Sequence, residues 1–149
     1  MVRYLWASPP TLVGLALVAT ALRRGRVRVV GGVIEASSPL VRWALTHLVP
    51  LRGGAMAITL GHVVLGRDAQ ALARTRAHER VHVRQYERWG PLFVPAYVAA
   101  SAWAAMRGGH FYYDNVFERE AMAAESRTPL RGASPRPPDS ARRRRLHRL

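Results

Sequence analysis

The sequence contains no cysteine. This absence excludes disulfide bonds, metal sites built from thiolates, and a catalytic cysteine nucleophile. Any metal site in the chain must therefore be built from histidine, aspartate and glutamate side chains. Nitrogen and oxygen ligands of this kind suit zinc or a related divalent ion.

Lysine is also absent, and acidic residues are few. All 23 basic residues are arginine, against 9 acids, which gives a net charge of +14. The segment 127–149 holds eight arginines and one acid, and so accounts for half of this surplus. Such a charge favours loose attraction to anionic lipid or nucleic acid. No aromatic residues are interleaved with the Arg142–Arg145 run and no folded nucleic-acid motif accompanies it, so we expect a solvated tail and no specific nucleic-acid partner.

Long hydrophobic runs are scarce as well. The segment 4–22 is uncharged, but its uninterrupted apolar part, 11–22, would form a helix of only about 18 Å, short of the ~30 Å of a bilayer core. Three interpretations remain open: a marginal membrane anchor, a signal-peptide core with cleavage after Ala19-Thr20-Ala21, or a buried helix. Cleavage fits poorly with Arg23 and Arg24, which follow at once. An anchor would leave the rest of the chain in the cytoplasm, so we expect membrane association with the folded domain on the cytoplasmic side, and a soluble cytoplasmic protein as the alternative.

Apolar spacing and turn residues divide the chain into an N-terminal segment 1–25, a folded domain 26–126 and a disordered tail 127–149 rich in Pro, Ser and Arg. Within the domain, alternating apolar residues predict two β-hairpins and helical spacing predicts four helices. The hairpins span 26–36 and 55–65, and the helices span 39–51, 68–89, 92–106 and 115–126. Asp68 and Asp114 are the expected N-caps of the second and fourth helices. This order indicates an α+β fold, with a small, mostly antiparallel sheet packed on the helix 68–89 and two further helices.

One short motif in the helix 68–89 predicts a metal site. His78-Glu79-Arg80-Val81-His82 places two histidines four residues apart on one helical face, with Glu79 beside them. Two imidazoles and a further carboxylate make the ligand set of a catalytic zinc ion whose fourth position is open to water. A carboxylate next to such a site acts as general base on that water. The sequence therefore predicts a Zn²⁺ site with His78 and His82 as ligands and Glu79 as the catalytic residue.

The motif and its surroundings resemble the gluzincin class of zinc metallopeptidases, in which a glutamate on a later helix completes the site. The metzincin pattern is excluded because Gln85 and Arg88 stand where that class has Gly and His. Here the segment 115–121 contains a Glu-x-Glu-Ala core that is similar to the second motif of small membrane-linked zinc peptidases. The stretch from Ala77 to Pro91 also resembles bacterial proteins with a minimal gluzincin core. The resemblance covers about 55–125 and implies a zinc-dependent metallopeptidase whose peptide or protein substrate lies extended along an edge strand.

Two glutamates of that segment compete for the position of third ligand. Glu118 aligns with the first Glu of the family's Glu-x-x-Ala pattern and is the preferred ligand, with Glu120 as the alternative. The two lie about 200° apart around a helix, so only one of them can meet the metal. The aspartate that orients a zinc-bound histidine in the family is replaced by Met122, and Asp114 or Asn115 is the candidate substitute. The alternative function is a non-catalytic, arginine-rich, membrane-associated domain that keeps the metal site for structure.

The remaining histidines and two tyrosines are assigned structural roles. His47, His62 and His110 are expected at the surface, because the motif already accounts for the metal ligands. Tyr112 and Tyr113 precede the helix of the third ligand and could polarise a carbonyl group, but aromatic packing is the preferred expectation.

Overall fold

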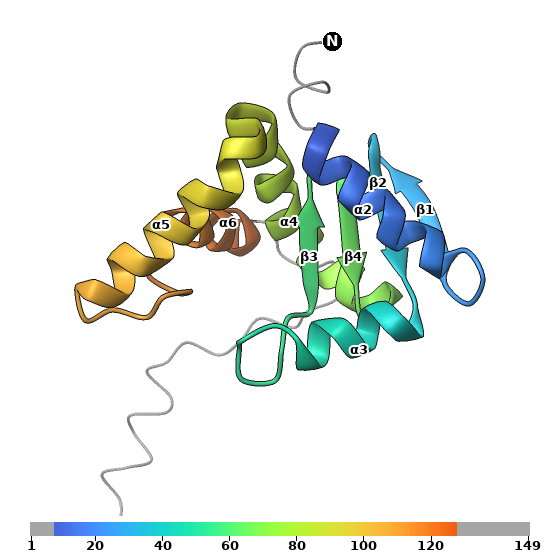
Figure 1. Cartoon of the computed structure of the whole chain (residues 1–149), viewed down its shortest axis with the longest axis horizontal. Coiled ribbons are helices and arrows are strands. Elements are labelled where there is room, and N and C mark those ends of the chain that lie inside the picture. Colours follow the sequence, from blue (N-terminus) through green and yellow to red (C-terminus); the bar gives the residue numbers. More distant parts are fainter. Residues whose placement is uncertain (1–7, 128–149) are drawn as a thin grey trace, which may run out of the picture.

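A sheet of four short strands organises the chain (Figure 1). The computed structural model describes residues 8–127. The strands are β1 (Arg26–Val30), β2 (Val33–Ser37), β3 (Ala57–Leu60) and β4 (Val63–Gly66). They lie in the order β1-β2-β4-β3, with helices packed on both faces. The predicted α+β class with a small sheet is confirmed.

Both hairpins predicted from the sequence are present. β1 pairs antiparallel with β2, and β3 pairs antiparallel with β4 through a tight turn in which Gly61 has a φ of 61°. Between the hairpins, β2 and β4 run parallel, with Glu35 opposite Val64. A parallel pairing needs a crossover connection, and α3 (Pro39–His47) lies in that connection. The sheet is therefore mixed, although two of its three strand pairings are antiparallel.

The helices α2 (Ser8–Ala21) and α3 cover one face of the sheet (Figure 1). Side chains that alternate along the strands point into this layer, where Val63 and Leu65 of β4 form a core cluster with Val18 of α2. The helix α2 approaches β4 closely because Gly14 has no side chain. A Cβ at this position would lie 2.7 Å from Val63 Cβ, so a larger residue would push the helix away from the sheet.

From Ser8 onward the N-terminal segment forms α2, which packs on the sheet with one side and leaves most of its residues exposed. Within residues 8–127, no helix combines the length and the apolar character that crossing a bilayer requires. Residues 4–7 of the segment, and the predicted disordered tail beyond Arg127, lie outside the described residues.

The long helix α4 (Ala69–Trp89) covers the opposite face of the sheet. Its apolar side chains pack on Val33 and Val64, which point away from the α2 layer. Asp68 caps this helix as predicted, since its carboxylate accepts a hydrogen bond from the backbone of the first turn. The motif histidines therefore stand on a helix that is anchored both at its start and along its buried side.

Two further helices complete the layer around α4. They are α5 (Phe93–Met106), which follows the short 3₁₀ turn η1 (Gly90–Leu92), and α6 (Val116–Ser126). The cap of α6 corrects a sequence prediction, because Asn115 and not Asp114 occupies this position. Asn115 is the extended residue before the first turn, and its Oδ1 accepts a hydrogen bond from Phe117 N at 2.9 Å. Asp114 instead closes the preceding turn by accepting a hydrogen bond from His110 N.

A buried carboxylate ties α4 to the first hairpin. Glu35 on β2 is only 2% exposed, and it accepts a hydrogen bond from Arg76 Nε at 2.7 Å and from Arg28 Nε at 2.8 Å. Burial alone would raise the pKa of Glu35. The hydrogen bonds and charges of Arg76 and Arg28 outweigh this effect and hold the pKa below its usual value. The ionised pair therefore stabilises the contact between the motif helix and the sheet.

Replacing Glu35 by Gln should lower the free energy of unfolding at neutral pH by about 1.5–3 kcal/mol, because the charge-assisted hydrogen bonds from Arg28 and Arg76 are weakened at a buried site. A carboxylate whose pKa is lowered in the folded state stabilises the fold at pH values above its unfolded-state pKa of 4.5. This contribution is lost as the pH falls through the folded-state pKa. The difference between wild type and variant in urea unfolding should therefore shrink below about pH 4.5.

Arg42→Gln is the control, because it removes an exposed ion pair with Asp68 at 3.4 Å and should cost less than about 1 kcal/mol. Equal losses in the two variants would contradict the role given to Glu35.

Candidate metal centre

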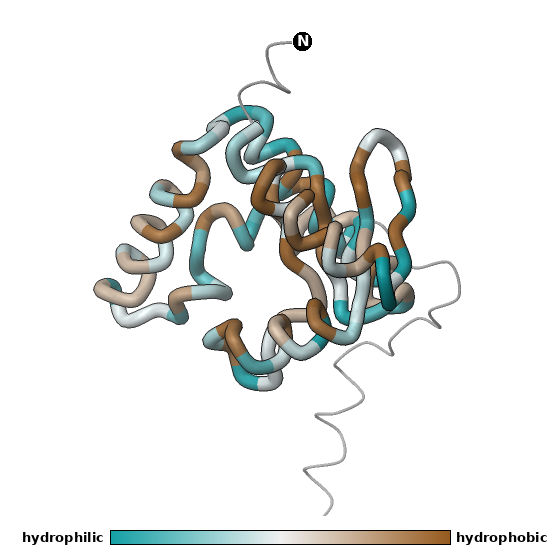
Figure 2. The backbone as a smooth tube through the Cα atoms, turned by 45° about the vertical axis from the view of Figure 1, so that its right-hand side comes forward, coloured by the Kyte–Doolittle hydropathy of each residue, from teal (hydrophilic) through white to brown (hydrophobic). Residues whose placement is uncertain are grey.

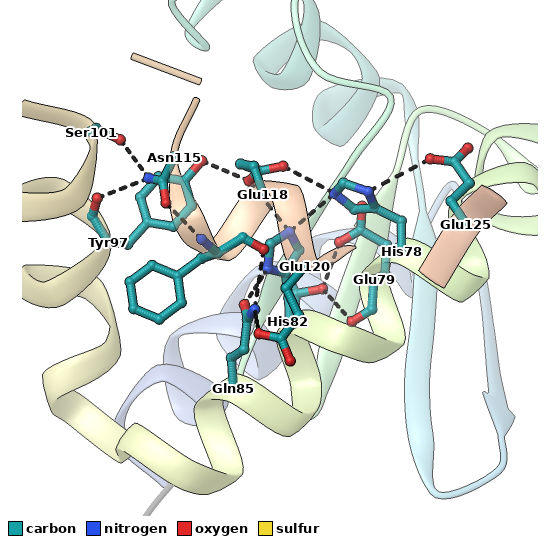
Figure 3. Close-up of polar contacts among 12 residues, drawn as sticks. His78, Glu79, His82, Gln85, Tyr97, Ser101, Asn115, Glu118, Glu120 and Glu125 are labelled. Atoms are coloured by element: carbon teal, nitrogen blue, oxygen red, sulfur yellow. Dashed lines mark hydrogen bonds and ion pairs between the residues drawn. The ribbon is translucent and has the colours of Figure 1, made fainter. Parts of the chain in front are cut away.

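One turn of α4 presents the three motif residues to the interior. His78 and His82 project from the same face toward α6, and Glu79 lies beside them (Figure 3). Their exposed fractions are 8% for each histidine and 5% for Glu79, so none of them belongs to a solvated helix face. The helix runs unbroken from its cap to Gly90, which keeps the two imidazoles one turn apart.

The carboxylate that meets both imidazoles belongs to Glu118, in the first turn of α6. Its Oε2 lies 3.2 Å from His78 Nε2 and its Oε1 lies 3.4 Å from His82 Nε2. The two Nε2 atoms are themselves 3.1 Å apart. Ring contacts hold α6 in this position, among them Phe117 against Phe93 with centroids 5.2 Å apart. The site is thus assembled between two helices that are far apart in the sequence.

These three side chains have the spacing of a metal site. Ligand atoms 2.0–2.1 Å from a tetrahedral zinc ion are about 3.3 Å from one another. Here the two Nε2 atoms are 3.1 Å apart, each lies 3.2–3.4 Å from a different oxygen of Glu118, and one ligand atom from each residue lies within 4.8 Å of the other two. Glu118 Oε2 is buried and lies 3.2 Å from His78 Nε2, so an ion between the two would take up lone pairs of both atoms. Two imidazoles and one carboxylate in a buried group therefore fit a divalent ion.

The electrostatics keep the third ligand ionised. Burial alone would raise the pKa of Glu118, but hydrogen bonds from His78 and His82 outweigh it and hold the pKa far below its usual range. For His82, burial would lower the pKa, whereas the hydrogen bond to Glu118 and the charges of Glu79 and Glu118 raise it overall. The cluster therefore favours positive charge next to the carboxylate. A bound cation would supply this charge in place of protons on the histidines.

Glu79 is held beside the cluster by a residue that the sequence did not single out. Thr59 on β3 is buried and donates a hydrogen bond from Oγ1 to Glu79 Oε2 at 2.6 Å. Burial raises the pKa of Glu79 above its usual value, although His82, Thr59 and His78 partly offset the effect. A carboxylate with a raised pKa accepts a proton more readily near neutral pH, as a general base must.

Gln85 orients His82. Its Nε2 donates to Glu120 Oε2 at 2.8 Å and to the carbonyl of Phe117 at 3.1 Å, so its Oε1 faces His82 Nδ1, at 2.8 Å. An amide oxygen only accepts, and therefore Nδ1 of a neutral His82 carries the proton and Nε2 keeps its lone pair for a metal.

This network corrects the sequence expectation that Asp114 or Asn115 orients a histidine. Asn115 donates instead to Tyr97 O and Ser101 Oγ, and the aspartate bonds only within its own turn. Gln85 could have been found from its spacing, because it lies three residues after His82 on the same helical face.

Two tyrosines also contact Glu118. Tyr97 donates from its hydroxyl to Glu118 Oε1 at 2.7 Å, and Tyr112 also hydrogen-bonds this carboxylate. Burial raises the pKa of both phenols, and the negative charge of Glu118 raises it further, so both stay protonated and act as donors. Tyr113, in contrast, is exposed. Of the two tyrosines considered from the sequence, Tyr112 thus reaches the site and Tyr113 does not.

The remaining described histidines lie away from the cluster. His47 contacts the carbonyl of Trp43, and His110 Nδ1 accepts from backbone N–H groups of its own loop. His62 departs from the surface position expected for it, because it is buried and pairs with Glu87 at 3.2 Å. At the cluster itself, Glu125 Oε2 lies 3.7 Å from Nδ1 of His78, the ring nitrogen that does not face Glu118.

Compared with protein-family models, with curated proteins and with solved structures, the chain gives no significant match. The gluzincin resemblance therefore rests on its two short motifs. Any function has to be argued from the arrangement of the residues themselves.

The cluster predicts close to one equivalent of zinc per chain, lost on His78→Ala or His82→Ala. Glu118→Gln should weaken zinc binding by orders of magnitude, because it removes the carboxylate that meets both imidazoles. Glu120→Gln should weaken it by no more than about 10–100-fold, since the hydrogen bond of Glu120 within residues 8–127 is made to Gln85 and not to an imidazole. Competition titration with a chromophoric chelator measures the zinc affinity of both variants. A larger loss for Glu120→Gln would move the third ligand to that residue.

The orienting role of Gln85 has its own test. Gln85→Leu should lower zinc affinity by about 10–100-fold, because Nδ1 of His82 loses its acceptor. The double variant Gln85→Glu/Glu120→Gln keeps an acceptor for His82 Nδ1 and reverses the hydrogen bond between positions 85 and 120. Its zinc affinity should therefore be higher than that of Gln85→Leu. Gln70→Leu, an exposed change on the same helix, is the control and should leave the affinity unchanged. The role is refuted if Gln85→Leu behaves like Gln70→Leu.

Proposed function

We propose that the chain is a zinc-dependent metallopeptidase that hydrolyses peptide bonds. The observation that supports this proposal best is the arrangement of Glu79, which is not a ligand but is buried beside the three candidate ligands. A purely structural site needs no such carboxylate. A hydrolytic site needs one, because a proton must leave the attacking water and reach the departing amine.

Each residue then has one role. His78, His82 and Glu118 would hold Zn²⁺, which when bound supplies a Lewis acid that acidifies water and polarises a carbonyl group. Thr59 occupies Oε2 of Glu79 and so leaves Oε1 to accept the proton of the attacking water and pass it to the amine nitrogen. The hydroxyl of Tyr112, protonated because of its raised pKa, is a donor near the site and suits stabilisation of negative charge on the carbonyl oxygen.

The position of β3 supports a peptide as the substrate. β3 is an outer strand of the sheet, so one of its edges is not paired with another strand of the described residues. The same strand carries Thr59, which contacts Glu79. An extended peptide added to this edge would gain backbone hydrogen bonds and would pass close to the metal cluster.

The burial of the cluster favours a second candidate, in which the metal is structural. Glu118 is only 3% exposed, and the ligands join α4 to α6 as a structural ion would. In this case the chain is a non-catalytic domain whose fold depends on zinc. The two candidates share their ligands and differ only in what Glu79 does.

Glu79→Gln separates the two candidates. On the catalytic proposal the variant should retain zinc and its fold but lose about 10²–10⁴-fold in peptide cleavage, because an amide cannot accept the proton. Glu87→Gln, a matched change on the same helix, should keep its activity. Cleavage is measured on a mixed peptide library by mass spectrometry. Wild-type protein that binds zinc, is stabilised by it and cleaves nothing would favour the structural candidate.

A further inference from the structure

The outer face of α2 and α3 is apolar although it is exposed. The helix α2 contains no charged residue, and of its 14 residues only Gly14, Val18 and Ala21 are buried. A helix that is apolar on all sides is normally covered on all sides. Here the sheet covers one side and leaves large side chains of α2, α3 and the residues just after them exposed, including Val13, Leu17, Leu22, Leu40, Trp43 and Leu48.

The charges around this face are mostly positive, and the partly exposed Asp68 beside α3 is already paired with Arg42. Residues 8–60 contain six arginines and a single acid, Glu35, which is buried and already paired. Arg23, Arg24 and Arg26 follow α2 directly and are exposed, and none of them forms an ion pair with another residue in 8–127. A partner for this face must therefore be apolar at its centre and negative at its border.

We propose that the outer face of α2 and α3 docks on an anionic lipid surface. The apolar side chains would enter the boundary between headgroups and acyl chains, and the arginines would meet the lipid phosphates. Trp43 suits this depth, because its ring is amphipathic. The helix α2 is about 21 Å long, short of the ~30 Å of a bilayer core, so it would lie along the surface.

The same charges argue against a second copy of the chain as the partner. In a two-fold dimer through this face, the arginines that follow α2 would meet a mostly positive surface, on which Asp68 is already paired with Arg42. Like charges brought together in an interface disfavour the association.

A second exposed apolar helix provides an internal comparison. α5 has no charged residue and lies at the outer edge of the molecule, with hydrophobic segments along its length (Figure 2). Its surroundings differ from those of α2, because the exposed acid Asp114 lies beside Gly109, just after the end of α5, together with the exposed Arg107. This mixed charge attracts an anionic surface less than the arginines after α2 do, so α5 serves as the control for α2 and α3.

The test uses the full chain and sedimentation with vesicles of phosphatidylcholine, with or without about one third phosphatidylglycerol. Val13→Glu/Trp43→Glu changes residues that are 57% and 52% exposed on the proposed face. Val98→Glu/Trp103→Glu makes the same changes on α5, where both residues are 59% exposed. The two variants have equal composition and net charge, so any adsorption through the arginines of 128–149 is affected equally.

We expect wild-type protein to bind the anionic vesicles and to stay partly bound in about 0.5 M salt, where purely electrostatic adsorption is screened. The α2/α3 variant should lose roughly tenfold or more in partition coefficient, and the α5 variant no more than about threefold. Circular dichroism and zinc content verify the fold of both.

Equal losses in the two variants, or full release by salt, would overturn the proposal in favour of adsorption through arginine alone. Concentration-dependent dimers that disappear in the α2/α3 variant, without vesicle binding, would overturn it in favour of a second copy. Neither result depends on peptide cleavage, so this test is independent of the proposed activity.

Discussion

The packing of α6 against α4 is the contact on which the candidate site depends. α4 alone offers two imidazoles, and a third ligand exists only because Phe117 of α6 packs against Trp89 of α4 and Phe93 of α5, which turns Glu118 toward them. A carboxylate buried without partners would destabilise the fold by several kcal/mol. Here the imidazoles and tyrosine hydroxyls surround it. The aromatic contacts and the polar cluster therefore stabilise the same helix pair.

The polar groups next to this contact are arranged so that each donor faces an acceptor. The amide of Gln85 joins His82 on α4 to Glu120 on α6, so the carboxylate that does not face the metal cluster still helps to orient a candidate ligand. Thr59 connects Glu79 to the sheet in the same way. A site whose supporting residues come from β3, α4, α5 and α6 is rigid only when all four elements are in place.

The sheet separates two surfaces of different chemistry. α2 and α3 on one side present apolar side chains and arginines, whereas the other side contains the metal cluster with the acids Glu79, Glu118 and Glu120. If the first side lies on a lipid surface, the cluster faces away from it. β3, at one end of the sheet, borders both layers, so a peptide could reach the cluster from the side.

The local features of this protein were determined by its sequence alone. Turn glycines placed the hairpins, Asp68 placed the start of α4, and the four-residue spacing put His78 and His82 on one face, because these features depend on neighbours along the chain. Glu118 and Glu120 both fitted the motif, and only the packing of α6 decided which one meets the imidazoles. The parallel pairing of β2 with β4 and the contacts of Thr59, Gln85 and Tyr97 were likewise settled by the tertiary structure. They join residues distant in sequence, and which distant residues meet is decided by the packing of the whole core.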